Sequence, residues 1–257
     1  AVGRHTGYTG TKTIDATGLV IAPGFIDVHG HIETGIFENP TADNYIYDGV
    51  TTVITGNCGS SARDLQEFFR RVDSLRPSIN VGSLIGHNTV RAQVMNRDNR
   101  SPSPAEQQQM EALVEQAMKD GAVGLSTGLI YIPGAYAKTE EVVGLAQAAA
   151  RYRGVYASHI RNEESSASEA INEAINIGKA ANIPVQISHF KIGGKANWGK
   201  SAMILDIVKK ARAEGWEVTI DQYPYTASST NLGVRLPDWA FAGGNDSLLA
   251  RLRHPAT

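Results

Sequence analysis

Short apolar segments alternate with helical segments along most of this chain, and this alternation restricts the folds that it can adopt. Seven apolar runs bounded by glycine, proline or asparagine predict strands, and the stretches between them show helical patterns. Strands that alternate with helices at this spacing favour parallel βαβ units. The strands are expected at Val20–Ile32, Val50–Asn57, Ile79–His87, Ala122–Leu129, Val155–Ile160, Pro184–Phe190 and Val218–Tyr223, and the helices at Ala62–Leu75, Ala105–Lys119, Thr139–Arg151, Ser166–Ala180 and Ser201–Ala213.

The strand count predicts an incomplete barrel. A closed (β/α)8 barrel contains eight parallel strands, whereas the sequence shows seven, followed by a Ser/Thr-rich loop and a helix expected from Pro237 to Arg253. Residues 1–20 hold only a few short β-like pieces, too few for an independent domain. We therefore expect an α/β fold in which residues 21–257 form a TIM-type barrel, residues 1–20 are the remnant of a small β domain, and the chain is truncated at both ends.

Composition excludes several classes of protein. At 257 residues the chain can bury a full core in one domain. A formal net charge of −2 does not indicate a nucleic-acid partner, and no apolar stretch is long enough to predict a membrane span. Cys58 is the only cysteine, which rules out an intrachain disulfide and favours a reducing compartment such as the cytoplasm. Nothing in the sequence indicates the oligomeric state.

Potential metal ligands are concentrated at the ends of the predicted strands. His29 and His31 end the first strand, and residues two apart on a strand point to the same side. Cys58, His159 and His189 end the second, fifth and sixth strands. A single histidine at a strand end is more often structural. However, a thiolate and four imidazoles at the carboxyl ends of strands, where barrel enzymes build their active sites, favour a zinc-type centre.

The remaining histidines are assigned other roles. His87 ends the third predicted strand, but the five other donors already complete a ligand set. We therefore expect His87 to support a ligand or brace a loop. His5 and His254 lie near the chain ends and are expected to be solvated.

The segments around these donors resemble those of a known family. Pro23–Asp27 followed by His29-x-His31 is similar to the opening motif of the amidohydrolase superfamily. Five further segments, in order, resemble the N-acyl-D-amino-acid deacylases (D-aminoacylases), and the resemblance extends from about residue 18 to residue 244: Thr55–Gly59, Gly128–Pro133, Ser158–Arg161, Ser188–Lys191 and Asp221–Tyr225. The resemblance implies a metal-dependent hydrolase barrel that cleaves the amide bond of N-acyl-D-amino acids.

The resemblance also implies roles for the donors. Cys58, His159 and His189 would hold one zinc ion tightly, while His29 and His31 would complete a weaker second site that shares Cys58. The family places an essential aspartate after the eighth strand, and this chain contains no such strand. We therefore expect the catalytic residue to lie beyond residue 257 and this chain alone to be inactive. Asp246 is expected in the first turn of a helix, and Asp27 and Asp221 are expected to brace the barrel mouth.

The expected product is an amino acid, so the small-molecule substrate carries an α-carboxylate. By the resemblance, this group would be held by Tyr131, Lys191, Tyr223 and Ser229. Arg235 interrupts an apolar context and suggests a bidentate pair with an acidic side chain, such as that of an N-acyl-D-glutamate. A surface arginine on a loop is the alternative. Arg161 is expected to form a local ion pair with Glu163 and Glu164.

Three other interpretations remain open at this point. Gly194–Ser201 matches the phosphate-binding pattern G-x-x-x-x-G-K-[ST] of nucleotide hydrolases, although several residues separate it from the preceding strand and Trp198 is bulky for such a loop. A hydrolase of cyclic amides would typically use a carboxylated lysine after the fourth strand, where Gly124–Leu129 has none. A metal-binding protein without catalytic activity is the third alternative.

Overall fold

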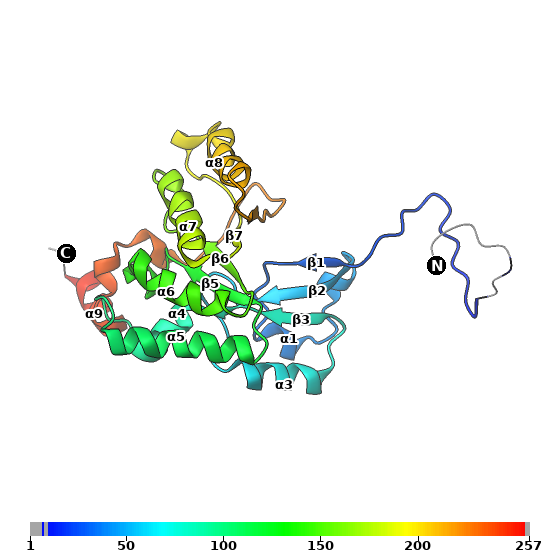
Figure 1. Cartoon of the computed structure of the whole chain (residues 1–257), viewed down its shortest axis with the longest axis horizontal. Helices are drawn as coiled ribbons and strands as arrows, with labels where there is room; N and C mark the ends of the chain where they lie inside the picture. Colours follow the sequence, from blue (N-terminus) through cyan, green and yellow to red (C-terminus); the bar gives the residue numbers. More distant parts are fainter. Residues whose placement is uncertain (1–6, 8–9, 255–257) are drawn as a thin grey trace.

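The computed structural model describes residue 7 and residues 10–254, which form parallel strands and helices (Figure 1). The strands are β1 (Phe25–Asp27), β2 (Val50–Thr55), β3 (Asn80–Ser83), β4 (Ile85–Gly86), β5 (Gly124–Gly128), β6 (Val155–His159), β7 (Val185–Ile187) and β8 (Val218–Ile220). The α-helices are α1 (Gly35–Glu38), α2 (Asp43–Ile46), α3 (Leu65–Leu75), α4 (His87–Met95), α5 (Pro104–Lys119), α6 (Thr139–Ala150), α7 (Ala167–Ala181), α8 (Ser201–Ala213) and α9 (Gly244–Arg253). Short 3-10 helices are η1 (Gly134–Tyr136), η2 (Lys195–Asn197), η3 (Leu232–Arg235) and η4 (Asp238–Phe241).

The strands form two parallel sheets that meet at Leu84. One sheet has the order β1-β2-β3 and the other the order β4-β5-β6-β7-β8. The single strand predicted at Ile79–His87 is therefore divided into β3 and β4, one in each sheet. The N–H of Leu84 still donates to the carbonyl of Thr55 at 2.9 Å, so hydrogen bonding continues across the break.

The parallel order confirms the predicted α/β architecture. Within each sheet, every strand pairs with its neighbours in sequence, as in the wall of a (β/α)8 barrel. Within the described residues, β1 and β8 each pair on one side only. Because all strands run in the same direction, their carboxyl ends lie along one rim, where the predicted ligands are found.

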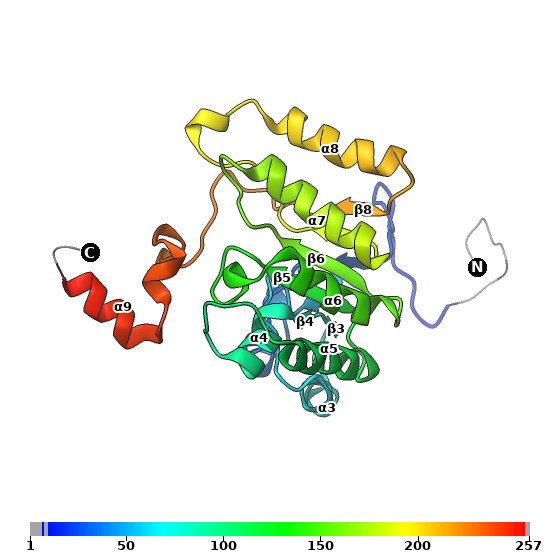
Figure 2. The same cartoon turned by 60° about the vertical axis from the view of Figure 1, so that its left-hand side comes forward.

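The core lies between the larger sheet and the helices that cover it (Figure 2). Met110 of α5, Leu125 of β5, Leu145 of α6 and Ile171 of α7 are fully buried in one apolar cluster. Burying each such side chain contributes roughly 1.5–3 kcal/mol to folding. A smaller cluster around Val53 supports the β1-β2-β3 sheet.

Two regions differ from the predicted elements. A helix, α4, begins at His87, where a strand was expected to end. Its buried face includes His87, Asn88 and Arg91, and these polar residues conceal the apolar period that marks a helix. The helix expected from Pro237 to Arg253 is divided into η4 and α9, because Gly243, which precedes α9, and Gly244, its first residue, adopt φ values of +85° and +84°. Asp246 lies in the first turn of α9, as predicted.

The described N-terminal segment extends away from the barrel, whereas the C-terminal segment contacts it through a hydrogen bond from the Tyr136 hydroxyl to the Asp238 carbonyl (Figure 1). Residue 7 and residues 10–20, the described part of the expected β remnant, contain no strand, and His5 lies outside the described residues. The strand expected from Val20 is limited to β1, and Val20 itself is 93% exposed. The segment that carries α9 lies to one side of the other helices (Figure 2). None of the described helices is long and apolar enough to cross a membrane.

Candidate metal centre

Five histidine and cysteine side chains converge at the carboxyl rim of the strands. His159 is the last residue of β6, His189 follows β7, Cys58 follows β2, and His29 and His31 follow β1. Their ligand atoms form two groups, each within 4.8 Å: Cys58 with His159 and His189, and Cys58 with His29 and His31. The structure therefore brings all five predicted donors together, with Cys58 belonging to both groups.

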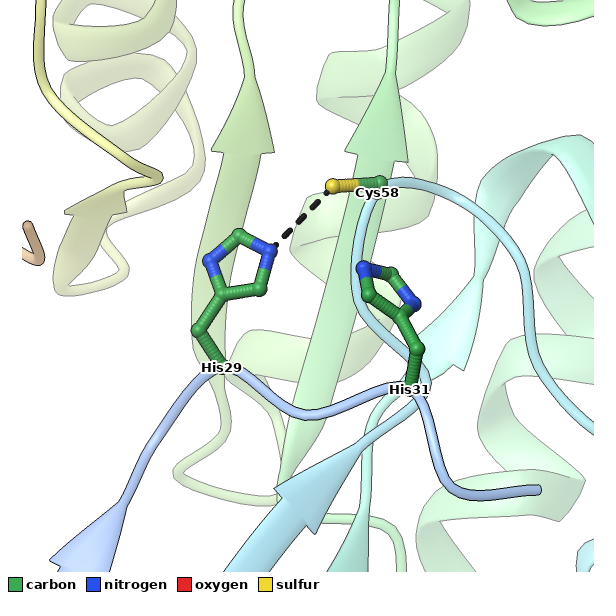
Figure 3. Close-up of side chains that lie close together, drawn as sticks. All are labelled: His29, His31 and Cys58. Atoms are coloured by element: carbon green, nitrogen blue, oxygen red, sulfur yellow. Dashed lines mark hydrogen bonds between the residues drawn. The ribbon is translucent and has the colours of Figure 1, made fainter. Parts of the chain in front are cut away.

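The Cys58 sulfur lies between the two groups. Its Sγ is 3.4 Å from Nε2 of His29 and 3.7 Å from Nε2 of His189. His31 points toward the same sulfur from the neighbouring loop (Figure 3). Nε2 of His189 is in turn 2.8 Å from Nδ1 of His159. A shared thiolate of this kind would bridge two ions.

Backbone strain is located at two of the donors. Cys58 has φ +53° and His189 has φ +36°, both in the left-handed region that residues other than glycine rarely adopt. Such a conformation costs about 1–3 kcal/mol and often occurs at functional sites. Gly59 allows the turn that follows Cys58, because a Cβ there would lie 2.1 Å from Oδ1 of Asn88.

Neighbouring side chains hold the Cys58 loop in place. The hydroxyl of Ser126 on β5 accepts a hydrogen bond from the Gly59 N–H at 3.1 Å and donates to the Gly56 carbonyl. The amide of Asn88, on α4, donates to the carbonyls of Gly128 and Tyr131, each at 3.1 Å. The strained thiol loop and the Tyr131 turn are thus fixed to the same buried scaffold.

A carboxylate supports a histidine of each group. Asp221, directly after β8, lies 3.1 Å from Nδ1 of His29 and accepts the backbone N–H of His189. In the tautomer with the proton on Nδ1, His29 donates a hydrogen bond to Asp221. Its Nε2 then carries the lone pair, which faces Cys58. Burial raises the pKa of Asp221, but the hydrogen bond from His29 and the other hydrogen bonds outweigh this effect and lower it.

Glu163 is a site residue that sequence reasoning missed. Its Oε1 is 2.8 Å from Nδ1 of His189 and 2.6 Å from Nζ of Lys191, and its Oε2 is 3.9 Å from Nε2 of His159. Burial opposes ionisation, yet hydrogen bonds from His189 and Lys191 help to lower the pKa of Glu163 to about 2. Its position in a loop gave no periodicity that could have indicated these contacts.

The prediction that Arg161 forms an ion pair with Glu163 and Glu164 was wrong. Arg161 donates instead to Glu173 of α7, with Nε at 3.0 Å from Oε2. It also donates to the backbone carbonyls of Ala135 and Ala137. A long side chain can reach a neighbouring helix, so proximity in sequence was a poor guide to its partner.

The protonation states of the candidate donors are compatible with zinc binding. Burial, followed by the Asp221 and Glu163 carboxylates, raises the pKa of the Cys58 thiol to about 12. Burial and the neighbouring His189 lower the pKa of His159 to about 3, so its imidazole is neutral near pH 7. Nδ1 of His159 faces Nε2 of His189 at 2.8 Å, whereas its Nε2 lies on the side of Glu163, 3.9 Å from Oε2. Neutral imidazoles and a cysteine that ionises on binding are a donor set typical of zinc.

The metal centre opens into a cavity of about 660 Å³. Four of the predicted substrate-binding residues, Tyr131, Lys191, Tyr223 and Ser229, line it together with all five donors. Arg235 does not line the cavity, although the preceding Val234 does. The Arg235 side chain is 74% exposed and its Nη1 lies 3.6 Å from Oε1 of Glu164.

Two other sequence features lie outside the metal centre. His87 is fully buried, and its Nε2 is 2.8 Å from Oε1 of Glu141, which also accepts Nε–H of Arg91 at 3.0 Å. This contact ties α4 to α6 and agrees with the bracing role expected of His87.

The segment that matches the phosphate-binding pattern does not form a direct turn from strand to helix. β7 ends at Ile187, well before Gly194, and Lys200 donates to Oδ1 of Asn197. Trp198 is 75% exposed between η2 and α8. The geometry therefore does not support the nucleotide-hydrolase alternative.

A parallel barrel wall with histidine and cysteine donors at its carboxyl rim defines a metallo-hydrolase type of scaffold. The family model described as "Amidohydrolase family" matches residues 12–230. The chain belongs to this family.

Individual relatives are consistent with that assignment. The chain is 37% identical to N-acyl-D-glutamate deacylase and 36% identical to D-aminoacylase of Alcaligenes xylosoxydans xylosoxydans, in each case over 90% of this chain and 52% of the relative. It superposes with a TM-score of 0.76, at 39% identity, on the crystal structure of N-acyl-D-glutamate deacylase from Bordetella bronchiseptica complexed with zinc and a phosphonate inhibitor, covering 79% of this chain and 48% of that one. The chain thus spans about half the length of these relatives, and the resemblance to N-acyl-D-amino-acid deacylases is confirmed.

Proposed function

We propose that this chain carries the metal centre of a zinc-dependent hydrolase that cleaves the amide bond of N-acyl-D-amino acids and releases a carboxylate and a D-amino acid. The observation that carries the proposal is the position of Cys58, whose Sγ belongs to two groups of histidines that line the 660 Å³ cavity. The similarity to D-aminoacylases and to a zinc-bound deacylase supports the same activity.

We assign the two groups of donors different affinities for zinc. Cys58, His159 and His189 would hold the tight zinc ion, because His159 is deeply buried and its neutral form is favoured. His29 and His31 would hold a weaker ion through the same thiolate, since His31 is exposed. A bound zinc ion polarises an amide carbonyl and lowers the pKa of water to about 7.

The polar residues of the cavity would orient the substrate. Lys191 supplies a cationic Nζ, which lies 5.5 Å from the centre of the Tyr223 ring. Tyr131 and Ser229 add hydroxyl groups on the same wall, and the Tyr131 hydroxyl is 2.9 Å from Oγ1 of Thr230. A cation flanked by hydroxyls suits the α-carboxylate of an N-acyl amino acid.

Proton transfer to the departing amine needs a carboxylate that is free to exchange protons. The two cavity-side carboxylates, Asp221 and Glu163, are each engaged by histidines, and hydrogen bonding lowers the pKa of both. We therefore assign neither as the proton carrier, and propose that an aspartate outside this chain performs that role. We also propose a small-molecule substrate and, from the single cysteine, a cytoplasmic location.

The test is hydrolysis by the full-length protein after zinc loading. N-acetyl-D-leucine and N-acetyl-D-glutamate should release acetate and the free D-amino acid, while the N-acetyl-L-amino acids should react much more slowly. Activity should be lost after treatment with a chelator and return with zinc. Absence of hydrolysis of every N-acyl-D-amino acid by zinc-loaded protein would show that the proposal is wrong.

A further inference from the structure

Nδ1 of His189 faces one group that can only accept a hydrogen bond and one that can only donate one. Oε1 of Glu163 lies 2.8 Å from this nitrogen and Nζ of Lys191 lies 3.0 Å from it. Glu163 and Lys191 also contact each other at 2.6 Å, so the three groups form a compact triangle. The carboxylate can only accept a hydrogen bond, and the ammonium can only donate one.

The two contacts select different tautomers of His189. A hydrogen bond from Nδ1–H to Glu163 leaves the lone pair on Nε2, which faces Cys58 and His159. A hydrogen bond from Lys191 to Nδ1 instead places the proton on Nε2, and that nitrogen then cannot bind a metal ion. The choice between the two partners therefore decides whether His189 is competent as a ligand.

Glu163 is well placed to control this choice. Its side chain is only 17% exposed, and its carbonyl accepts the N–H of Gly193 at 2.7 Å, which ties it to the loop after β7. Lys191 is held next to it by a second hydrogen bond, from Nζ to the His189 carbonyl at 3.2 Å. The ammonium thus cannot move away from the histidine without leaving both partners.

We propose that Glu163 is a positioning residue with two effects: it keeps His189 in the tautomer that binds metal, and it partly neutralises Lys191. The second effect rests on the proposed function, in which Lys191 receives the substrate carboxylate. Removing the charge of Glu163 should then weaken metal binding and strengthen carboxylate binding. A residue that merely stabilised the fold would weaken both.

The tautomer can be observed directly in the metal-free chain. Long-range ¹H–¹⁵N NMR spectra of imidazoles identify which ring nitrogen carries the proton. His189 should be protonated at Nδ1 in the unmodified chain and in Glu164→Gln, and at Nε2 in Glu163→Gln. Glu164 is the matched control because it is adjacent in sequence but lies near Arg235, outside the cavity lining. An unchanged His189 tautomer in a folded Glu163→Gln chain would overturn the proposal.

Zinc affinity, measured by competition with a chelator, gives the second test. Glu163→Gln should bind zinc about 10–100-fold more weakly than the unmodified chain, the range typical for loss of a group that orients a ligand. In the background of Lys191→Met the same substitution should cost much less, because no ammonium then competes for Nδ1. An equal loss in both backgrounds would contradict the role assigned to Glu163. Should Glu163→Gln fail to fold, Glu163→Asp keeps the charge and should retain the Nδ1 tautomer; protonation at Nε2 would contradict the proposal.

Binding of N-acetyl-D-leucine to zinc-saturated protein tests the effect on Lys191. This probe has a single carboxylate, so Arg235 does not complicate the comparison. Glu163→Gln should bind it several-fold more tightly than Glu164→Gln, and weaker binding would overturn this part. If neither protein binds any N-acyl-D-amino acid, the proposed function is wrong, whereas the tautomer and zinc measurements still decide the role of Glu163.

Discussion

His29 and Asp221 lie 192 positions apart in the sequence, yet Nδ1 of His29 is 3.1 Å from Oδ1 of Asp221. His29 follows β1 and Asp221 follows β8, so this contact joins the two outermost strands of the described sheets. The same Asp221 oxygen accepts the backbone N–H of His189. One carboxylate oxygen thus contacts a donor of each metal group and links the loops that follow β1 and β8.

The Asp221→Asn substitution should reduce zinc affinity by about 10–100-fold, because an amide no longer selects the Nδ1–H form of His29. Competition with a chelator measures the change. Asp206→Asn is the control, since Asp206 lies on the exposed face of α8 and its side chain is 70% exposed. Equal zinc affinities of the two variants would show that Asp221 does not orient the histidines.

Sharing of Cys58 predicts how zinc content responds to the loss of each donor. His31→Ala should keep about one tightly bound zinc ion per chain and lose a second, weaker one, while His159→Ala should lose the tight ion. Cys58→Ala should lose both, because its sulfur belongs to both groups. Atomic emission after dialysis provides the count. Retention of a tight ion in Cys58→Ala would contradict the shared site.

Zinc binding should become tighter as the pH rises. The Cys58 thiol, with its pKa raised to about 12 by burial and by nearby carboxylates, is protonated near pH 7 and must lose its proton to bind zinc. His159, with its pKa lowered to about 3, is already neutral and releases none. The apparent affinity should therefore rise by up to about tenfold per pH unit below the thiol pKa.

Calorimetry in buffers of different ionisation enthalpy measures the protons released. Zinc binding to the His31→Ala chain, whose tight site is complete, should release about one proton per ion, because the Cys58 thiol ionises on binding. Release of no proton would show that Cys58 binds as an existing thiolate or does not bind.

The buried cluster of His87, Arg91 and Glu141 should contribute strongly to stability. Glu141→Gln removes the countercharge of Arg91, whose side chain is 0% exposed, and should lower the free energy of unfolding by roughly 3–5 kcal/mol. Urea denaturation measures the loss. Glu67→Gln breaks the exposed pair with Arg70 and should change stability very little. Similar effects of the two substitutions would contradict the difference in burial.

The sequence was informative where a local pattern decides the structure. The apolar runs located the strands found in the described residues, and α8 begins and ends at the predicted residues, Ser201 and Ala213. The convergence of the five candidate donors could be predicted because parallel strands bring their carboxyl ends together regardless of the distance in sequence. The same logic located Lys191, which lies two residues after His189.

Residues whose role depends on a contact across the fold were harder to predict. Helix α4 has a buried polar face that resembles no amphipathic pattern, so only its packing against α6 explains it. Glu163 and Arg161 are close in sequence, but Glu163 turns to His189 and Arg161 to Glu173. The left-handed backbone conformation of Cys58 and His189 also depends on the surrounding loops, and no local sequence pattern indicates it.

Arg235 gives the prediction about specificity. It follows Val234, which lines the cavity, and its nearest anionic partner is the exposed Glu164 at 3.6 Å. An acidic substrate side chain would replace Glu164 as the partner of Arg235 and form a bidentate pair with the guanidinium. The full-length protein should therefore hydrolyse N-acetyl-D-glutamate with a higher kcat/KM than N-acetyl-D-leucine.

The Arg235→Met substitution should separate this role from that of a surface arginine. It should lower kcat/KM for N-acetyl-D-glutamate by about 10–100-fold, the worth of a hydrogen bond to a charged group, and leave N-acetyl-D-leucine unaffected. Arg253→Met, on the exposed end of α9, is the control and should change neither rate. Faster hydrolysis of N-acetyl-D-leucine by the unmodified protein would reject the acidic preference, because the substrate charge would then bring no benefit at the cavity entrance.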